Sequence, residues 1–449
     1  MLLTTPSLSG STTILAILSI SLVPLAIAGL ALINTGLGRS RSAAHTMVGT
    51  FCALSVAMMV YCVWGFALQG TAGGQAHVIH IGSKAWNWLA IEPWFFRGVI
   101  FDGSAKSLIA WLQMLSVGMA VVIPLGASAE RCRLGATCLS TVVLAGCTYP
   151  IFAHWALGGG WLAQLGVNYG LGQGFLDAGG SGTIHVVGGL TALSVAWIVG
   201  SRHGKYSPEG LPMAIPGHNA VVVVFGCLLA LLGWIGLNGA GALLLMGVPA
   251  GRFVLVAVNT MLTAAAAGLA SAAITRLRFG KMDCSLAANG LVGGLVSISA
   301  ACATVTPPAA IMIGLVAGAL VTFSVEMLEL RLSIDDPGGA ISVHATGGLW
   351  GLLAAGLLTP LVSPASTMHD AGVAIVNTSY AGQWLAQCIG IATLLGFVLP
   401  LAYGLNQLVN RFYKYRVTAE GEAHGIDLHE LGAGAYPDFV THPDDFLQR

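Results

Sequence analysis

The sequence predicts an all-α polytopic membrane protein with eleven transmembrane helices. Two observations support this prediction. Hydrophobic residues make up 56% of the 449 residues and charged residues only 8%, a composition that does not suit a soluble globule of this size. In addition, a fourteen-residue phrase occurs twice, as DAGGSGTIHVVGGL at 177–190 and as DPGGAISVHATGGL at 336–349, and each copy begins an apolar run.

Apolar runs of about twenty residues, the length that crosses a hydrocarbon core of about 30 Å, recur along the chain. They fall near residues 12–34, 46–69, 106–127, 134–155, 182–200, 217–239, 253–275, 284–305, 308–330, 339–360 and 383–410. We expect the first run to be a retained span, because it is too long for the apolar part of a cleaved signal and no basic residue precedes it. An odd number of spans places the termini on opposite sides of the membrane.

Basic residues predict the orientation. With the N-terminus outside, fourteen Lys and Arg residues fall on the inner side and four on the outer side, in agreement with the excess of positive charge in cytoplasmic loops. His185 then lies near the outer start of the fifth helix and His344 near the inner start of the tenth. Helices one to five and six to ten therefore form an inverted repeat around a central pore, with the eleventh helix packed across the outside.

The composition also excludes several classes of function. Net charge is zero, and no stretch combines clustered basic residues with aromatic ones, so no nucleic-acid partner is expected. The nine cysteines are scattered without metal-site spacing, which predicts neither a disulfide framework nor a metal or cofactor site. No phosphate-binding loop or catalytic triad order occurs, so the chain is not expected to be an enzyme.

The chain divides into two parts by composition. Residues 1–411 form the predicted transmembrane domain, and residues 412–449 change to a charged and polar tail on the inner side. The outer segment 70–104, which is rich in tryptophan and phenylalanine, is expected to be an aromatic cap at the membrane interface. Glu130 and Arg131, at the inner end of the third helix, are expected to form a structural ion pair.

His185 and His344 are the first candidates for function, because ionisable side chains inside membrane spans are costly and usually functional. A single histidine in a helix is more often a packing residue. Two at matching places of an inverted repeat meet at its interface instead. Two neutral imidazoles can share one hydrogen bond and leave a donor and an acceptor for a small polar molecule or a proton relay, whereas they are a poor metal site without further ligands.

Asp177 and Asp336 stand eight residues before the two histidines, each followed by glycines. For Asp336 we favour a cap that accepts hydrogen bonds from free backbone N–H groups at the helix start. For Asp177 two roles remain open. It can cap its helix in the same way, or it can attract an incoming cation from the outer side.

Seven further stretches share the pattern of a known family. They are SAER at 128–131, YPIFAHWALGGG at 149–160, PGHN at 216–219, GWIGLN at 233–238, SLAANGLVGGLVSISAACATVTP at 285–307, IDDPGGAISVHATGGLWG at 334–351 and HGIDLHELGAGAY at 424–436. Together with the phrase at 177–189, they make the chain resemble the Amt/Mep/Rh family of ammonium transporters over nearly its whole length.

The resemblance implies a homotrimer whose protomers each conduct ammonium or ammonia across the cytoplasmic membrane, with no cofactor. It implies that His185 and His344 are the paired pore histidines and Asp177 the aspartate of the outer vestibule. The tail resembles the regulatory C-terminus of the family, which in many bacterial members responds to a PII signalling protein.

Four positions depart from the family pattern. Where typical members have a vestibule tryptophan, two gate phenylalanines and a binding-site serine, this chain has Leu157, Ser116, Leu237 and Gly241. A cation over an aromatic face gains about 0.5–2 kcal/mol, and that means of recruitment is lost here. The outer constriction is expected to be wider, unless nearby aromatics such as Trp111, Trp155 or Trp161 compensate.

The sequence thus predicts transport of ammonium or ammonia, with deprotonation in the outer vestibule and passage of a neutral species past the histidines. A bare cation in an apolar pore is too costly, whereas neutral ammonia needs only a few hydrogen bonds. The alternative is a sensor, or a member of altered specificity, that binds ammonium or another small amine and conducts little. A purely structural membrane subunit is disfavoured by the paired histidines.

Overall fold

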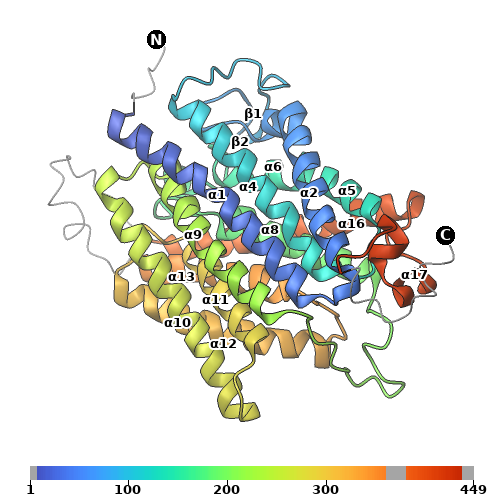
Figure 1. Ribbon diagram of the computed structural model, residues 1–449. Coiled ribbons are helices and arrows are strands. Elements are labelled where there is room, and N and C mark those ends of the chain that lie inside the picture. Colours follow the sequence, from blue (N-terminus) through green and yellow to red (C-terminus); the bar gives the residue numbers. More distant parts are fainter. Residues whose placement is uncertain (1–7, 360–380, 437–449) are drawn as a thin grey trace.

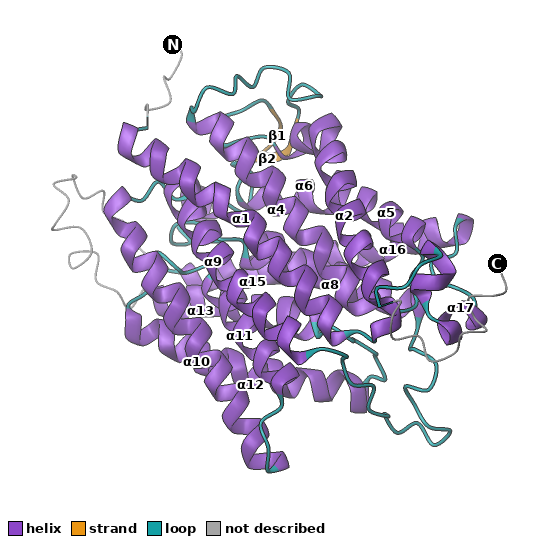
Figure 2. Ribbon diagram, in the orientation of Figure 1, coloured by secondary structure: helices purple, strands orange, loops and turns teal. Residues whose placement is uncertain are grey.

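The computed structural model describes residues 8–359 and 381–436 (Figure 1). Helices dominate it, and the few strands lie at one edge (Figure 2). The symbol η marks short 3-10 or π-helical turns that begin, interrupt or follow the α-helices. The helical elements are α1 (Gly10–Leu37), η1 (Ser40–Ser42), α2 (Ala43–Val60), η2 (Tyr61–Gly65), α3 (Phe66–Gln69), α4 (Ala105–Ser128), α5 (Leu134–Val143), η3 (Leu144–Thr148), α6 (Tyr149–Ala156), α7 (Leu165–Tyr169), η4 (Ser181–Val186), α8 (Val187–Val199), α9 (Ala220–Leu245), η5 (Ala250–Arg252), α10 (Phe253–Phe279), α11 (Cys284–Ile298), α12 (Pro307–Arg331), η6 (Ile341–Thr346), α13 (Gly347–Leu358), α15 (Gln383–Thr393), η8 (Leu394–Val398), α16 (Leu399–Phe412), α17 (Ala419–His424) and η9 (Asp427–Leu431).

Joined across their turns, these elements give ten helices in the described residues that are long and apolar enough to cross a membrane, together with one shorter apolar helix, α11. Each lies where the sequence predicts an apolar span. The last one, Gln383–Phe412, contacts α13 with its first part and α8 and α5 with its second. The final residues of the predicted tail, 437–449, lie outside the described part of the chain.

The predicted span 284–305 is wrong in its last third, residues 299–305. Helix α11 ends at Ile298, and turns follow as far as the start of α12. The irregular backbone is buried against the first copy of the repeated phrase, where Gly179 N donates to Ser299 O at 2.8 Å and Ala300 N donates to Ser181 Oγ at 2.8 Å. Non-helical backbone at membrane depth is tolerated where protein groups satisfy it in this way.

The outer segment contains a β-hairpin that the all-α prediction misses. Strand β1 (Ala76–Ile81) pairs antiparallel with β2 (Lys84–Ala90). Its tryptophans contact the segment around α6: Trp86 stacks on Trp161, and Trp88, which stays partly exposed, lies against Trp155. The hairpin thereby covers the end of α6, while Trp94 and Phe95 remain exposed.

The two copies of the repeated phrase cross each other in opposite directions. Turn η4 contacts α13, and turn η6 contacts α8. The crossing is close because it uses glycine: a Cβ added at Gly189 would lie 2.4 Å from Ala345 N, and one added at Gly348 would lie 2.6 Å from Ser181 O. Small residues that let backbones approach are the usual means of packing helices in lipid.

Helix α17 and the segment around it pack at the end of the bundle opposite the start of α1 (Figure 1). The segment joins the bundle by a short antiparallel bridge between Cys132 and Arg416. Arg133 N donates to Tyr415 O, and Val417 N donates to Arg131 O, each at 2.9 Å. The described part of the tail is therefore a docked structure.

Candidate functional site

The two repeated histidines meet. Nδ1 of His344 lies 3.2 Å from Nδ1 of His185, and the ring centroids are 5.2 Å apart. Their side chains are buried, and Nε2 of His185 has no hydrogen-bond partner. Each histidine lies in a π-helical turn, η4 or η6, that begins its helix. Such turns are rare and are frequent at functional sites.

Each histidine turn is held by the aspartate that precedes it. Asp177 accepts from Gly182 N at 3.0 Å and Thr183 N at 2.7 Å, and Asp336 accepts from Ala340 N at 2.9 Å and Ile341 N at 2.7 Å. The glycine that enters each turn has positive φ, 84° at residue 180 and 65° at residue 339, which glycine adopts without steric penalty.

The capping role favoured for Asp336 is confirmed. Asp177 has the same geometry, and its side chain is buried. Its carboxylate is directed to the backbone of η4 by these hydrogen bonds. The two copies of the phrase thus fold alike around their histidines.

Trp234 completes the histidine pair. Its ring stacks on His185 with centroids 5.1 Å apart and an interplanar angle of 14°, and its Nε1 donates to Ser299 Oγ at 3.2 Å. Trp234 was not predicted from the sequence to belong to the site. Its place in the stretch GWIGLN at 233–238 could have indicated it. The stacking fixes the plane of the imidazole and so directs its free Nε2.

The four predicted vestibule and gate positions come together around one cavity. A small hollow of about 10 Å³, about the space that one water molecule needs, is lined by Ser116 from α4, Leu157 from the end of α6, and Leu237 and Gly241 from α9. The remaining lining residues are Leu112, Gln113, Ala178, Gly179, Gly180, Thr183, Ile184 and Leu245. Since Thr183 and Ile184 directly precede His185, the cavity lies beside the histidine pair.

Aromatic compensation is absent from this cavity, since none of the described residues that line it is aromatic. Trp155 and Trp161 are engaged with the hairpin instead. Trp111 lines a separate apolar groove with Phe96 and Phe101. The three tryptophans proposed as substitutes therefore lie elsewhere.

The space beside the Cα of Gly241 is filled by the backbone of another segment. A Cβ added there would lie 2.0 Å from the carbonyl oxygen of Ala178, a separation that real Cβ atoms do not show. The backbone before η4 thus fills the place that a side chain at residue 241 would take.

A buried charge network closes the other end of the bundle. Arg202 donates to Glu130 Oε1 at 2.7 Å and to both carboxylate oxygens of Asp335 at 2.9 Å. Glu130 also pairs with Arg39, and Arg131 lies 3.8 Å from Asp335. The predicted ion pair between Glu130 and Arg131 is wrong, because each of the two side chains pairs with a residue distant in the chain. Glu130 itself has a positive φ of 73°.

Asp335 is ionised within this network. Burial alone raises its pKa, but the hydrogen bonds and charges of Arg202 and Arg131 outweigh burial and hold the pKa below its ordinary value. A buried carboxylate that is paired on both oxygens keeps its charge at neutral pH. The network therefore ties the loop before η6 to the loop after α8.

The tail caps two helices of the bundle. Asp427 accepts from Ala44 N at 3.1 Å and His45 N at 2.7 Å at the start of α2, and Glu430 accepts from Leu134 N at 3.0 Å at the start of α5. Carboxylates at helix N-termini satisfy free N–H groups and interact favourably with the helix dipole.

Glu422 is the third acidic contact of the tail. It accepts from Arg416 at 2.8 Å and from His203 N and Nδ1 at 2.7 Å. Burial raises its pKa, but the hydrogen bonds from His203 and the charge of Arg416 outweigh burial, so the pKa lies below the ordinary value. The docked tail is thus held by three carboxylates.

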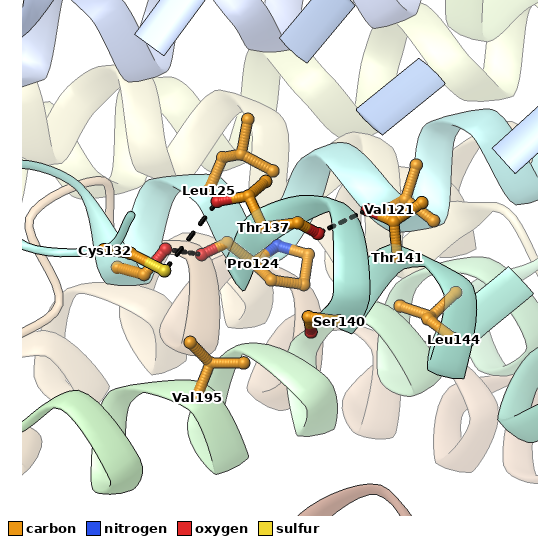
Figure 3. Close-up of a pocket in the computed structure, with 10 residues that line it drawn as sticks. Val121, Pro124, Leu125, Cys132, Thr137, Ser140, Thr141, Leu144 and Val195 are labelled. Carbon is orange, nitrogen blue, oxygen red and sulfur yellow. Dashed lines mark hydrogen bonds between the residues drawn. The ribbon is translucent and has the colours of Figure 1, made fainter. Parts of the chain in front are cut away.

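A further small hollow of about 10 Å³ lies between α4, α5 and α8, near the bridge to the tail (Figure 3). Two of the hydroxyls that line it are already used: Ser128 donates to Pro124 O and Thr141 donates to Thr137 O, each at 2.9 Å. Burial raises the pKa of the Cys132 thiol to about 11, so it stays protonated and unreactive. Neither His185 nor His344 lines this hollow.

In the described residues, no group of three or more His, Cys, Asp or Glu side chains could hold a metal ion. Membrane-length apolar helices that enclose a small cavity and a pair of buried imidazoles define a multi-pass membrane transport protein.

Comparisons with known proteins identify the family. The model of the Ammonium Transporter Family matches residues 14–436. Ammonium transporter Amt2 of Archaeoglobus fulgidus is 34% identical over 418 residues, which cover 92% of this chain and 85% of the relative. The ammonium transporter of Bacillus subtilis is 32% identical over 411 residues, covering 91% and 94%. The chain belongs to the ammonium transporter family, a family of transporters and not of enzymes.

Solved structures share the fold. A protein described as a sensor Amt protein superposes with a TM-score of 0.81 at 26% identity, covering 93% of this chain and 98% of the other. Mep2 of Candida albicans superposes with a TM-score of 0.78 at 24% identity, covering 97% and 93%.

Proposed function

We propose that this protein conducts ammonia derived from ammonium across the cytoplasmic membrane, through a pore in each protomer that passes His185 and His344. The observation that carries the proposal is the contact between the two imidazoles, buried beside a small cavity in a chain of the ammonium transporter family. Multi-pass transporters among its bacterial and archaeal relatives support a location in the cell membrane.

The chemistry follows from the tautomers of the pair. One ring donates its Nδ1 proton and the other accepts it, so one Nε2 is an acceptor and the other a donor. A neutral molecule that both donates and accepts can replace water along this path. A bare cation gains too little there to offset its desolvation. Ammonium therefore gives up a proton to water at the outer cavity, and ammonia passes the histidines.

The architecture around the pore is part of the proposal. We infer eleven spans, with the short α11 as the eighth, the N-terminus outside and the C-terminus inside. The antiparallel crossing of the two repeated phrases supports an inverted repeat. The basic residues on the side of the docked tail support the orientation.

We further propose a homotrimer with a cytoplasmic regulatory tail over 412–449, which a PII-type signalling protein contacts. The three carboxylate contacts of the tail support a regulatory element that docks on the bundle. Removing it would free the starts of α2 and α5.

A second function is a sensor that binds ammonium, or another small amine, and conducts little. Two observations favour it: the outer cavity has no aromatic lining among the described residues, and one structural neighbour is described as a sensor. Both functions need the histidine pair, but only the first needs passage beyond it.

Uptake of labelled methylammonium by a transporter-deficient cell separates the two functions. We expect uptake by the wild-type protein and its loss in His185→Ala and His344→Ala. A matched control is His77→Ala, in the exposed strand β1, which should leave uptake unchanged. Ammonium binding to the purified protein without uptake favours the sensor. Undiminished uptake in both pore variants contradicts the proposed pathway.

A further inference from the structure

We propose that the hydroxyl of Thr183 accepts a hydrogen bond from the ammonium cation in the outer cavity and transmits to it the negative charge of the buried Asp177. This inference rests on the proposed function and adds a substrate-binding residue to it. The described residues that line the cavity include no aromatic ring that could attract a cation. A different group is therefore needed to bind ammonium there.

Thr183 is the uncommitted polar group of this cavity. The residue is fully buried at 0% exposure, it lines the cavity, and its Oγ1 has no hydrogen-bond partner. Buried hydroxyls are paired in the large majority of cases, so an exception needs an explanation. An unpaired hydroxyl on a residue that lines a small cavity is explained by a ligand about the size of a water molecule that occupies the cavity.

The other polar side chains around the cavity are already engaged. Ser116 Oγ donates to Leu112 O at 2.9 Å within its own helix. Gln113 Oε1 accepts from the hydroxyl of Tyr149 at 2.7 Å. Each keeps some hydrogen-bonding capacity, but the proton of Ser116 and an acceptor site of Gln113 are in use. Thr183 keeps its lone pairs available, since no group donates a hydrogen bond to its Oγ1.

Asp177 supplies the charge without touching the cavity. Its oxygens accept from the backbone N–H groups of Gly182 and Thr183, and it is not among the lining residues. Burial raises the pKa of Asp177 to about 6, and the backbone N–H groups and the hydroxyl of Thr183 act against that rise, so the carboxylate is mostly ionised at neutral pH. No hydrogen bond of normal geometry joins the hydroxyl to the carboxylate.

A hydroxyl that turns its proton toward Asp177 presents its lone pairs to the cavity. Hydrogen bonds in such a chain polarise one another, and the effect is strong in a buried, low-dielectric place. An N–H of ammonium that donates to Thr183 then forms a charge-assisted hydrogen bond, which is about twice as strong as a neutral one. Thr183 thereby does part of the work that aromatic faces do in typical family members.

Thr183→Val tests the inference, because valine keeps the branched shape and removes only the hydroxyl. Hydrogen bonds to charged groups are worth enough to change affinity by about ten-fold or more. We expect the apparent KM for methylammonium to rise by about that factor. The matched control is Thr191→Val in α8, whose buried hydroxyl donates to Val187 O within its own helix. It should leave KM unchanged.

A second pair of variants covers the case in which Thr183→Val does not fold. Thr183→Ser and Thr183→Ala both lose the methyl group and differ only in the hydroxyl, so the serine variant should bind tightly and the alanine variant weakly. If the wild-type protein binds without conducting, the same ten-fold change is expected in the Kd for ammonium chloride measured by calorimetry.

The possible results separate the inference from the function. Equal affinities for the serine and alanine variants, or a wild-type KM in Thr183→Val, overturn the role of Thr183 and leave the transport proposal intact. A wild-type protein that neither takes up methylammonium nor binds ammonium refutes the proposed function itself.

Discussion

Nδ1 of His185 and Nδ1 of His344 lie 3.2 Å apart, although the residues are separated by 159 positions in the chain. Only one proton fits between two such atoms, so the rings must adopt different tautomers, one with Nδ1 protonated and the other with Nε2 protonated. The stacking of Trp234 on His185 fixes one of the two planes. The pair can therefore offer a small molecule a donor on one side and an acceptor on the other.

Replacing either capping aspartate with alanine should destabilise the protein by about 0.5–2 kcal/mol, because the N–H groups at the start of η4 or η6 lose their acceptor. Thermal unfolding of the detergent-solubilised protein measures the loss. Asp177→Asn and Asp336→Asn should unfold close to the wild-type temperature, since asparagine also caps well.

The asparagine variants also decide whether Asp177 attracts the cation. If it does, Asp177→Asn raises the KM for methylammonium and Asp336→Asn does not, because only Asp177 adjoins the outer cavity through Thr183. Identical KM values in the two variants leave capping as the sole role of Asp177.

Gly241→Ser, which restores the usual residue of the family, should destabilise the protein. Its Cβ would meet Ala178 O at 2.0 Å, so the segment before η4 must shift, and overpacking of a buried site typically costs about 1–3 kcal/mol. The control is Gly404→Ser on α16, where an added Cβ meets nothing within 4 Å. An unchanged unfolding temperature for Gly241→Ser would show that the backbone at Ala178 yields freely.

Ser116→Phe combined with Leu157→Trp should narrow the substrate range. Both positions line the outer cavity, so two large aromatic side chains reduce its volume and restore faces that attract a cation. Competition of methylammonium uptake by ammonium and by larger amines measures the range. An unchanged pattern of competition would argue against a widened cavity in the wild-type protein.

Docking of the tail through Glu422 should resist mild acid. The folded-state pKa of Glu422 is lowered from the ordinary value of 4.5, so its contribution is complete above that pH and is lost only as the pH falls further, through the lowered pKa. Proteolysis of the tail should therefore stay slow from neutral pH down to about 5.

Glu422→Gln should expose the tail to protease already at neutral pH, because Arg416 and His203 lose the carboxylate that accepts their hydrogen bonds. Glu420→Gln, an exposed acidic residue of the same helix, serves as the control and should behave as the wild type. Release of the wild-type tail near pH 6 would contradict the assignment of Glu422 as the anchor.

Much of the fold could be predicted from the sequence, because membrane spans are specified by local hydrophobicity. The apolar runs coincide with the helices, and the repeated phrase singled out both histidines. The end of α11 at Ile298 was missed because the residues after it are equally apolar. The hairpin at 76–90 was missed because its tryptophans were interpreted as facing the membrane interface, whereas they pack on the end of α6.

The sequence by itself determined that this protein is a polytopic membrane protein of the ammonium transporter family and that His185 and His344 are its matched histidines, because length, apolarity and repetition are properties of the chain alone. Only the tertiary structure decided that the two rings share a hydrogen bond, that Asp177 faces the backbone, that Ala178 fills the place beside Gly241, and that the Thr183 hydroxyl is left unpaired. Those facts depend on how segments far apart in the chain pack, and packing follows from the shape of the whole bundle.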